Sequence, residues 1–181
     1  MVEWAGMDLK DALKLTREIP DFPKPGILFL DITPVLSNAT AFSTVVTEME
    51  KSLDGATVIG GIEARGFILA AGLASRTTMG FVPFRKQGKL PYETHGAKYG
   101  LEYGDDELEL HVDAFIPTDR VLIVDDVLAT GGTLIAAIEL AGLCGAKVEK
   151  VLVLFEIDFL EGRKRIKEKY PDLEIVSLAH A

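Results

Sequence analysis

The hydrophobic positions of this chain recur with two different periods, and these periods predict where helices and strands lie. Strict alternation of polar and apolar residues over 107–114 predicts a strand with one face in water. A short helix is expected over about 9–18, with Asp8 as its cap, before three prolines and a glycine interrupt regular structure at 19–27. Apolar residues at i, i+3, i+4, i+7 spacing predict an amphipathic helix through Phe42, Val45, Val46, Met49 and Leu53.

Continuous apolar runs predict a second group of strands that are buried on both faces. The strands so predicted are 57–62, 80–84 and 121–124, and a further strand is predicted at 148–157, which reads VEKVLVLFEI. Helices are predicted after the first run, through the letters GFILAAGLASR, and after the third, over about 132–144. Alternation of strands with helices indicates an α/β fold whose mostly parallel sheet is flanked by helices on both faces. The 107–114 strand then belongs to an antiparallel flap, paired with part of 85–104.

Length, charge and cysteine content narrow the class of protein. A chain of 181 residues suits one domain, with room for a small appended segment. Its net charge of −9 argues against nucleic acid and anionic membranes as partners, so an anionic substrate needs a local basic patch. The single cysteine, Cys144, allows no disulfide framework within the chain. The first residues are too polar for a signal peptide, and we expect a cytoplasmic protein without nucleic-acid or membrane partners.

Candidate chemistry gathers where the 121–124 strand ends. Asp125 and Asp126 follow the strand, at the edge where open α/β sheets bind ligands. The turn at 129–133 reads Ala-Thr-Gly-Gly-Thr and opens a helix, whose first amides have no partner within the helix and point toward ligand. This turn is therefore predicted to bind phosphate, and the aspartates to meet sugar hydroxyls or a phosphate-bound Mg²⁺. The alternative is an ordinary strand–turn–helix corner with a threonine cap.

The whole stretch VLIVDDVLATGGT resembles the signature of type I phosphoribosyltransferases, which bind 5-phosphoribosyl 1-pyrophosphate. The resemblance implies that the aspartate pair meets the ribose hydroxyls and that the Ala-Thr-Gly-Gly-Thr loop holds the 5′-phosphate. The residues so implied are Asp125, Asp126, Ala129, Thr130, Gly131, Gly132 and Thr133. This motif is specific to the superfamily and does not select one base.

Three more segments, 19–36, 63–67 and 85–104, are similar to adenine phosphoribosyltransferases. The resemblance implies a type I phosphoribosyltransferase fold with a small N-terminal hood, in a single domain over 1–181. It also implies the reaction of adenine with 5-phosphoribosyl 1-pyrophosphate to give AMP and pyrophosphate in purine salvage. Mg²⁺ would be carried by the substrate, with no direct protein ligand, and the enzyme would be a homodimer.

Two segments carry positive charge suited to a pyrophosphate group. The letters EARG place Ala64 and Arg65 at another strand-to-helix corner, where the planar guanidinium suits a pair of phosphate oxygens. The family often has a cis peptide in this loop, which here is the bond from Glu63 to Ala64. The second segment supplies the local basic patch: Arg85, Lys86 and Lys89. A solvated run of charges is the alternative for this patch.

The 85–104 segment is predicted to be a flexible catalytic lid, because its glycines make it pliable and loops of this length usually have a function. By resemblance, Glu102 lies near the purine and Tyr103 near the reacting sugar. Glu102 is a candidate to relay a proton as N9 becomes the nucleophile, and both residues join Arg65 as predicted catalytic residues. The acidic residues that follow are interpreted as exposed charges on the wet face of a strand: Asp105, Asp106, Glu107 and Glu109.

The base is predicted to bind in the segment of about 1–36. By resemblance, Phe29 stacks on adenine while backbone groups of Leu28 read its edge; a core phenylalanine is the alternative. Leu30 stands where the family commonly has a basic residue, so hypoxanthine or guanine stays open as the base. A non-catalytic sensor of phosphoribosyl pyrophosphate is a further alternative, which the retained Arg65, Lys89 and Glu102 and the acidic charge disfavour. The basic helix EGRKRIKEKY near the C-terminus is interpreted as a solvated face.

Overall fold

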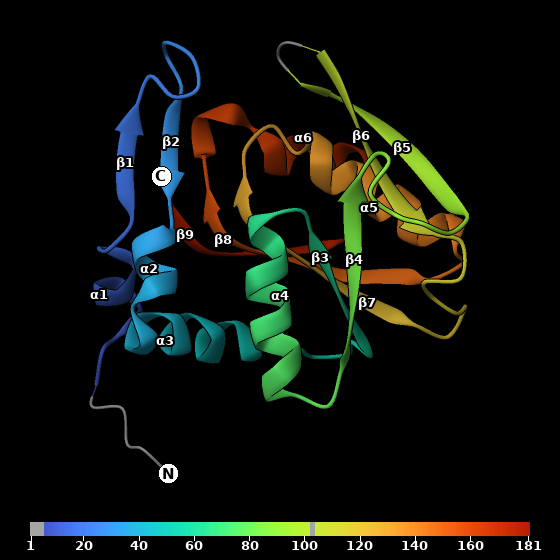
Figure 1. Ribbon diagram of the computed structural model, residues 1–181, viewed down its shortest axis with the longest axis horizontal. Coiled ribbons are helices and arrows are strands. Elements are labelled where there is room, and N and C mark those ends of the chain that lie inside the picture. Colours follow the sequence, from blue (N-terminus) through green and yellow to red (C-terminus); the bar gives the residue numbers. More distant parts are fainter. Residues whose placement is uncertain (1–5, 102–103) are drawn as a thin grey trace. The chain divides into compact units, whose positions relative to one another are not determined.

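The computed structural model describes residues 6–101 and 104–181, and Figure 1 follows their order from blue to red. The chain divides into two compact units, Met1–Lys51 and Ser52–Ala181. Each unit has its own secondary structure.

The smaller unit combines a two-stranded hairpin with short helices. Its elements are α1 (Leu9–Leu13), β1 (Arg17–Pro20), β2 (Leu28–Asp31), α2 (Thr33–Ser37) and α3 (Ala39–Glu50). The Asp8 cap is confirmed, since the Asp11 backbone amide donates to Asp8 Oδ1 at 2.8 Å. The helix ends at Leu13 rather than near residue 18, because the chain from Arg17 onward pairs antiparallel with β2.

The larger unit is built on a seven-stranded sheet with the strand order β5-β6-β4-β3-β7-β8-β9. Its elements are β3 (Val58–Ile62), α4 (Arg65–Arg76), β4 (Gly80–Lys86), β5 (Thr94–Leu101), β6 (Gly104–His111), β7 (Arg120–Leu128), α5 (Gly132–Leu143), β8 (Lys147–Glu156), the 3-10 turn η1 (Asp158–Leu160), α6 (Gly162–Lys169) and β9 (Glu174–His180).

The strand directions confirm the predicted α/β architecture. The run from β4 through β3, β7 and β8 to β9 is parallel, while β6 pairs antiparallel with both β4 and β5. The antiparallel flap is therefore the β5–β6 hairpin, drawn in yellow-green in Figure 1. The edge strand β9 was not predicted, because its residues are mostly half-buried and its apolar pattern is weak.

Helices cover both faces of the central strands. In β7, Val121 and Ile123 belong to the apolar core that also contains Leu134 and Ala137 of α5. Leu122, between them, is also fully buried, and α4 packs on β3 and β7. A parallel strand buried on both faces accounts for the unbroken apolar run in the sequence. Among the residues described, none of the helices combines the length and the apolarity needed to cross a lipid bilayer.

The close approach of α4 to the sheet depends on a glycine in β3. A Cβ atom on Gly61 would lie 2.7 Å from the Cβ of Ala70 in α4 and 2.7 Å from Cε2 of Phe81 in β4. Real Cβ atoms do not approach other carbons so closely, so the packing of α4 on β3 requires the missing side chain. This packing sets the position of the first turn of α4 at the carboxyl edge of the sheet.

We expect Gly61→Ala to lower the free energy of unfolding by about 1–3 kcal/mol, the usual cost of adding a methyl group to a full core. Urea denaturation measures the change. The matched control is Gly142→Ala on α5, where a Cβ would meet no atom within 4 Å. Equal stability of the Gly61→Ala variant and the parent would contradict this account of the α4 packing.

Candidate active site

Two adjacent carboxylates lie close to the carboxyl end of β7, as predicted. Asp125 and Asp126 are 9% and 5% exposed, and the Asp126 amide donates to Asp125 Oδ1 at 2.9 Å. The strand was expected to end at residue 124, yet β7 continues to Leu128 because its ladder with β8 runs on to Glu156. The aspartates are thus fixed within a paired strand and are more rigid than loop residues would be.

The predicted phosphate turn adopts the geometry of an open helix start. Gly131 is the N-cap of α5, with a left-handed φ of 79°, and it has no side chain to cap the first amides. Gly132 begins the helix, and a Cβ there would lie 3.3 Å from the backbone oxygen of Gly100 in β5. The positive end of a twelve-residue helix therefore begins beside the flap, a few residues after the aspartate pair.

The first turn of α4 contacts the aspartates. A Cβ on Gly66 would lie 2.8 Å from the Val124 backbone oxygen and 2.9 Å from Asp125 Oδ1, so α4 begins directly against the end of β7. Arg65 Nε lies 2.9 Å from Asp126 Oδ2 in an ion pair whose geometry makes no hydrogen bond. The peptide between Glu63 and Ala64 is cis, as the resemblance implied. Arg65, Asp125 and Asp126 thus form one cluster.

Burial controls the protonation of the two aspartates. It raises the pKa of Asp125 well above the ordinary 3.8, and the neighbouring charge of Asp126 raises that pKa further. Burial also raises the pKa of Asp126, although the Arg65 guanidinium opposes this shift. Without a ligand, each additional negative charge at the end of β7 is therefore costly, and a hydrogen-bond donor arriving there would reduce that cost.

The basic segment is held at its start by a carboxylate that the sequence analysis did not assign. Arg85 Nε and Nη2 donate to Glu63 at 3.2 and 3.3 Å, and the Lys86 backbone amide donates to the same carboxylate at 2.9 Å. Arg85 Nη1 also donates to the Lys89 backbone oxygen at 3.2 Å. Burial alone would raise the pKa of Glu63, but these donors hold it below its usual value. No pattern in the sequence distinguished Glu63 from an ordinary residue at a helix start.

Asp106 and Tyr99 link the basic segment to the phosphate turn. Asp106 was predicted to be an exposed charge, and the structure corrects that prediction. Asp106 is half-buried rather than exposed: Lys86 Nζ lies 2.8 Å away, and Tyr99 Oη donates to Asp106 Oδ2 at 2.9 Å. Tyr99 also interacts with Thr133, and burial together with the Asp106 hydrogen bond raises the Tyr99 pKa. Glu107 and Glu109, on the opposite face of β6, are also half-buried. The Gly88 backbone amide donates to Glu109 Oε2 at 2.9 Å, and Glu107 lies against Gly96 of β5.

Both predicted base-binding residues belong to the smaller unit. Phe29, in β2 of the smaller unit, packs edge-to-face on Phe22 with ring centroids 5.1 Å apart. Leu28 is 37% exposed, whereas Leu30 is buried in that unit. Glu102 and Tyr103 lie outside the described residues, so their roles stay predictions.

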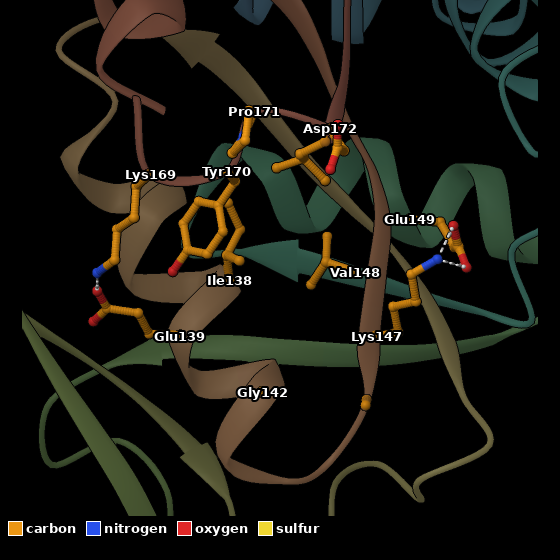
Figure 2. Close-up of a pocket in the computed structure, with 12 residues that line it drawn as sticks. Ile138, Glu139, Gly142, Lys147, Val148, Glu149, Lys169, Tyr170, Pro171 and Asp172 are labelled. Atoms are coloured by element: carbon orange, nitrogen blue, oxygen red, sulfur yellow. Dashed lines mark hydrogen bonds and ion pairs between the residues drawn. The ribbon is translucent and has the colours of Figure 1, made fainter. Parts of the chain in front are cut away.

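A cavity of about 510 Å³ reaches the phosphate turn: it is lined by Gly132 together with Tyr99, Gly100 and Arg165, and it does not include the aspartate pair. A cavity of about 520 Å³ lies between the second half of α5, the start of β8 and the segment after α6, and Figure 2 shows Tyr170 and Pro171 on its wall. None of the predicted site residues line it. Glu156, Asp158 and His180 place ligand atoms within 4.8 Å of one another, but Arg163 already binds the Glu156 carboxylate. We therefore assign no metal there.

Comparison with known proteins places this arrangement in a defined class. Residues 36–179 match the family described as the phosphoribosyl transferase domain. The adenine phosphoribosyltransferase of Carboxydothermus hydrogenoformans is 53% identical over 165 residues, which are 90% of this chain and 95% of that protein.

Solved structures agree with the sequence comparison. The crystal structure of adenine phosphoribosyltransferase from Thermoanaerobacter pseudethanolicus superposes with a TM-score of 0.90 at 47% identity, over 96% of this chain and 99% of the other. The APRTase of Giardia lamblia in complex with 9-deazaadenine superposes with a TM-score of 0.91 at 38% identity, over 97% and 99%. The chain belongs to the adenine phosphoribosyltransferase family.

The burial of Asp125 predicts that its charged form lowers the stability of the folded protein. Because the folded-state pKa is raised above 3.8, the unligated protein loses stability as the pH rises from 3.8 through the raised pKa. We expect Asp125→Asn, which keeps the Oδ1 acceptor, to raise the free energy of unfolding at neutral pH by about 1 kcal/mol or more.

The gain should shrink as the pH approaches 3.8, where the unfolded aspartate also takes up its proton. Urea denaturation at the two pH values measures it, with Asp54→Asn as the control on an exposed aspartate. A variant that is less stable than the parent at neutral pH would contradict the assignment of burial as the dominant cause.

Proposed function

We propose that the chain transfers the 5-phosphoribosyl group of 5-phosphoribosyl 1-pyrophosphate to adenine, giving AMP and pyrophosphate. This is a glycosyltransferase reaction of purine salvage. The observation that carries the proposal is the cluster at the end of β7, where two buried aspartates precede an open helix start and meet Arg65 from the neighbouring helix. The names of the relatives support adenine over hypoxanthine or guanine, and an enzyme over a non-catalytic sensor.

The sugar phosphate is fixed by the end of β7 and the start of α5. The backbone amides of 130–133 and the hydroxyls of Thr130 and Thr133 receive the 5′-phosphate, whose charge the helix N-terminus stabilises. Asp125 and Asp126 accept hydrogen bonds from the ribose hydroxyls, which supply the donors that these buried carboxylates need. The ribose is thereby held in one orientation, and this positioning lowers the barrier to attack at C1′.

The leaving pyrophosphate binds to the arginine and lysine side chains of the site. Arg65, Arg85, Lys86 and Lys89, together with the Ala64 corner, stabilise the charge that develops as the C1′–O bond breaks. Three of these cations are paired with carboxylates of the chain: Arg65 with Asp126, Arg85 with Glu63 and Lys86 with Asp106. The pyrophosphate replaces those carboxylates as the partner, so the cations are positioned before substrate arrives.

The nucleophile is N9 of the base. Phe29 stacks on the purine and the Leu28 backbone reads its edge. Glu102 takes or relays the purine proton as N9 attacks, and Tyr103 lies beside the reacting sugar. The 85–104 segment closes over the site and excludes water, which would otherwise trap an oxocarbenium-like transition state.

Mg²⁺ enters with the substrate in this proposal. Oxygen donors suit this hard cation, and the two carboxylates at the end of β7 fit a substrate-borne ion or its bound water without forming a closed protein cage. When bound, the ion neutralises part of the pyrophosphate charge. The resemblance also supports a homodimer, with the 85–104 segment or its flanks near the partner subunit, and action in the cytoplasm.

A competition experiment tests the function. The protein is incubated with 5-phosphoribosyl 1-pyrophosphate, Mg²⁺ and equal concentrations of adenine, hypoxanthine and guanine, and the nucleotides are separated and quantified. We expect AMP as the dominant product. An excess of a 6-oxopurine nucleotide would transfer the assignment to another base, and binding of the phosphoribosyl donor without turnover would favour the sensor.

We expect Glu102→Leu to lower kcat by about 100-fold or more, the range for loss of a general acid–base group, with a smaller change in KM. Steady-state kinetics with adenine measures both constants. Glu93→Leu, at an exposed glutamate in the same segment, is the control and should retain the parent kcat. An effect confined to KM would show that Glu102 binds the base without taking part in the chemistry.

A further inference from the structure

We propose that Gly162 and Arg163, at the start of α6, are positioning residues for the phosphate turn at 129–133. From the residue pattern alone, this basic helix is interpreted as a solvated face. The inference rests on the proposed function, because the phosphate turn is what α6 would position.

The start of α6 presses on the phosphate turn through backbone atoms. A Cβ on Gly162 would lie 2.1 Å from the Ala129 backbone oxygen and 2.7 Å from Cδ1 of Leu128. The contact is reciprocal, since a Cβ on Gly131 would lie 2.8 Å from the Gly162 backbone oxygen and 3.2 Å from Cγ1 of Ile166. The two glycines therefore allow the backbone at the start of α6 to contact the backbone of the phosphate turn, which leads into α5.

Arg163 anchors the start of α6 to the sheet. Its Nε donates to both Glu156 oxygens at 2.9 and 3.0 Å, and its Nη1 donates to the Ile175 backbone oxygen at 2.8 Å. Its Nη2 donates to Glu156 Oε2 and, at 2.9 Å, to the Ser177 hydroxyl. One guanidinium thus joins α6 to the last residue of β8 and to β9.

The hydrogen bonds of Arg163 form a rigid contact because the Glu156 carboxylate, which accepts most of them, is almost fully buried. Glu156 is 5% exposed, and Ser177 Oγ also donates to its Oε2 at 2.6 Å. Glu156 is the register partner of Leu128, the residue just before the phosphate turn. A displacement of α6 would break several charge-assisted hydrogen bonds around the buried Glu156 carboxylate. If a side chain were added between α6 and the phosphate turn, we therefore expect the turn to move rather than the helix.

The next two charged residues of α6 have different surroundings. Lys164 and Arg165 are exposed; Lys164 pairs with Glu161 at the helix start at 3.3 Å, and Arg165 lines a cavity that reaches Gly132. The solvated interpretation therefore holds for Lys164, whereas Gly162 packs against the phosphate turn and Arg163 holds the start of α6 on the sheet.

Calorimetric titration with ribose 5-phosphate tests the proposal, together with steady-state KM values for both substrates. For Gly162→Ala we expect the Kd for ribose 5-phosphate and the KM for 5-phosphoribosyl 1-pyrophosphate to rise about tenfold or more. The KM for adenine should stay at the parent value, a split that general destabilisation would not produce. Gly142→Ala, the same change in an open helical position, is the matched control and should bind like the parent.

A second variant keeps the test decisive if Gly162→Ala does not fold. Arg163→Lys retains the charge but loses the planar set of donors, and we expect it to weaken ribose 5-phosphate binding, while the same change at the exposed Arg120 at the start of β7 does not. Parent-like binding by folded Gly162→Ala, or by Arg163→Lys where the first variant does not fold, would overturn the inference and leave the proposed function intact. Failure of the parent to bind ribose 5-phosphate at all would instead overturn the proposed function, and the inference with it.

Discussion

The site depends on one constraint, which is the burial of two adjacent carboxylates near the end of a paired strand. Asp125 and Asp126 are held by the β7–β8 ladder and covered by the first turn of α4, which approaches closely because Gly66 has no side chain. Burial without enough donors is unfavourable, as the raised pKa of Asp125 indicates. In the proposed function the ribose hydroxyls supply these donors, and their hydrogen bonds offset the cost of burying the two carboxylates.

The charges around this pair are arranged before any substrate arrives. Arg65 pairs with Asp126, Arg85 with Glu63 and Lys86 with Asp106. A chain of net charge −9 thereby keeps a local set of cations ordered by its own carboxylates. Cations that are already held in place in this way are what electrostatic preorganisation requires.

Much of the fold could be predicted from periodicity, because buried parallel strands leave unbroken apolar runs and the amphipathic pattern of α3 is clear. The aspartate pair and the glycine turn were also predictable, since both occupy one short segment. Glu63, Tyr99, Asp106 and Gly162 were missed because their roles depend on contacts across the sheet. Asp106 looks like an exposed charge until Lys86 of β4 and Tyr99 of β5 are brought beside it.

The central claim is that the turn after Asp126 receives the terminal phosphate of a sugar on its backbone amides. A crystal structure of the protein with AMP tests this claim most directly. The account predicts phosphate oxygens within hydrogen-bonding distance of the amides of residues 130–133, with the ribose hydroxyls on the carboxylates of Asp125 and Asp126. An AMP phosphate bound elsewhere, with this turn closed by packed side chains, would contradict it.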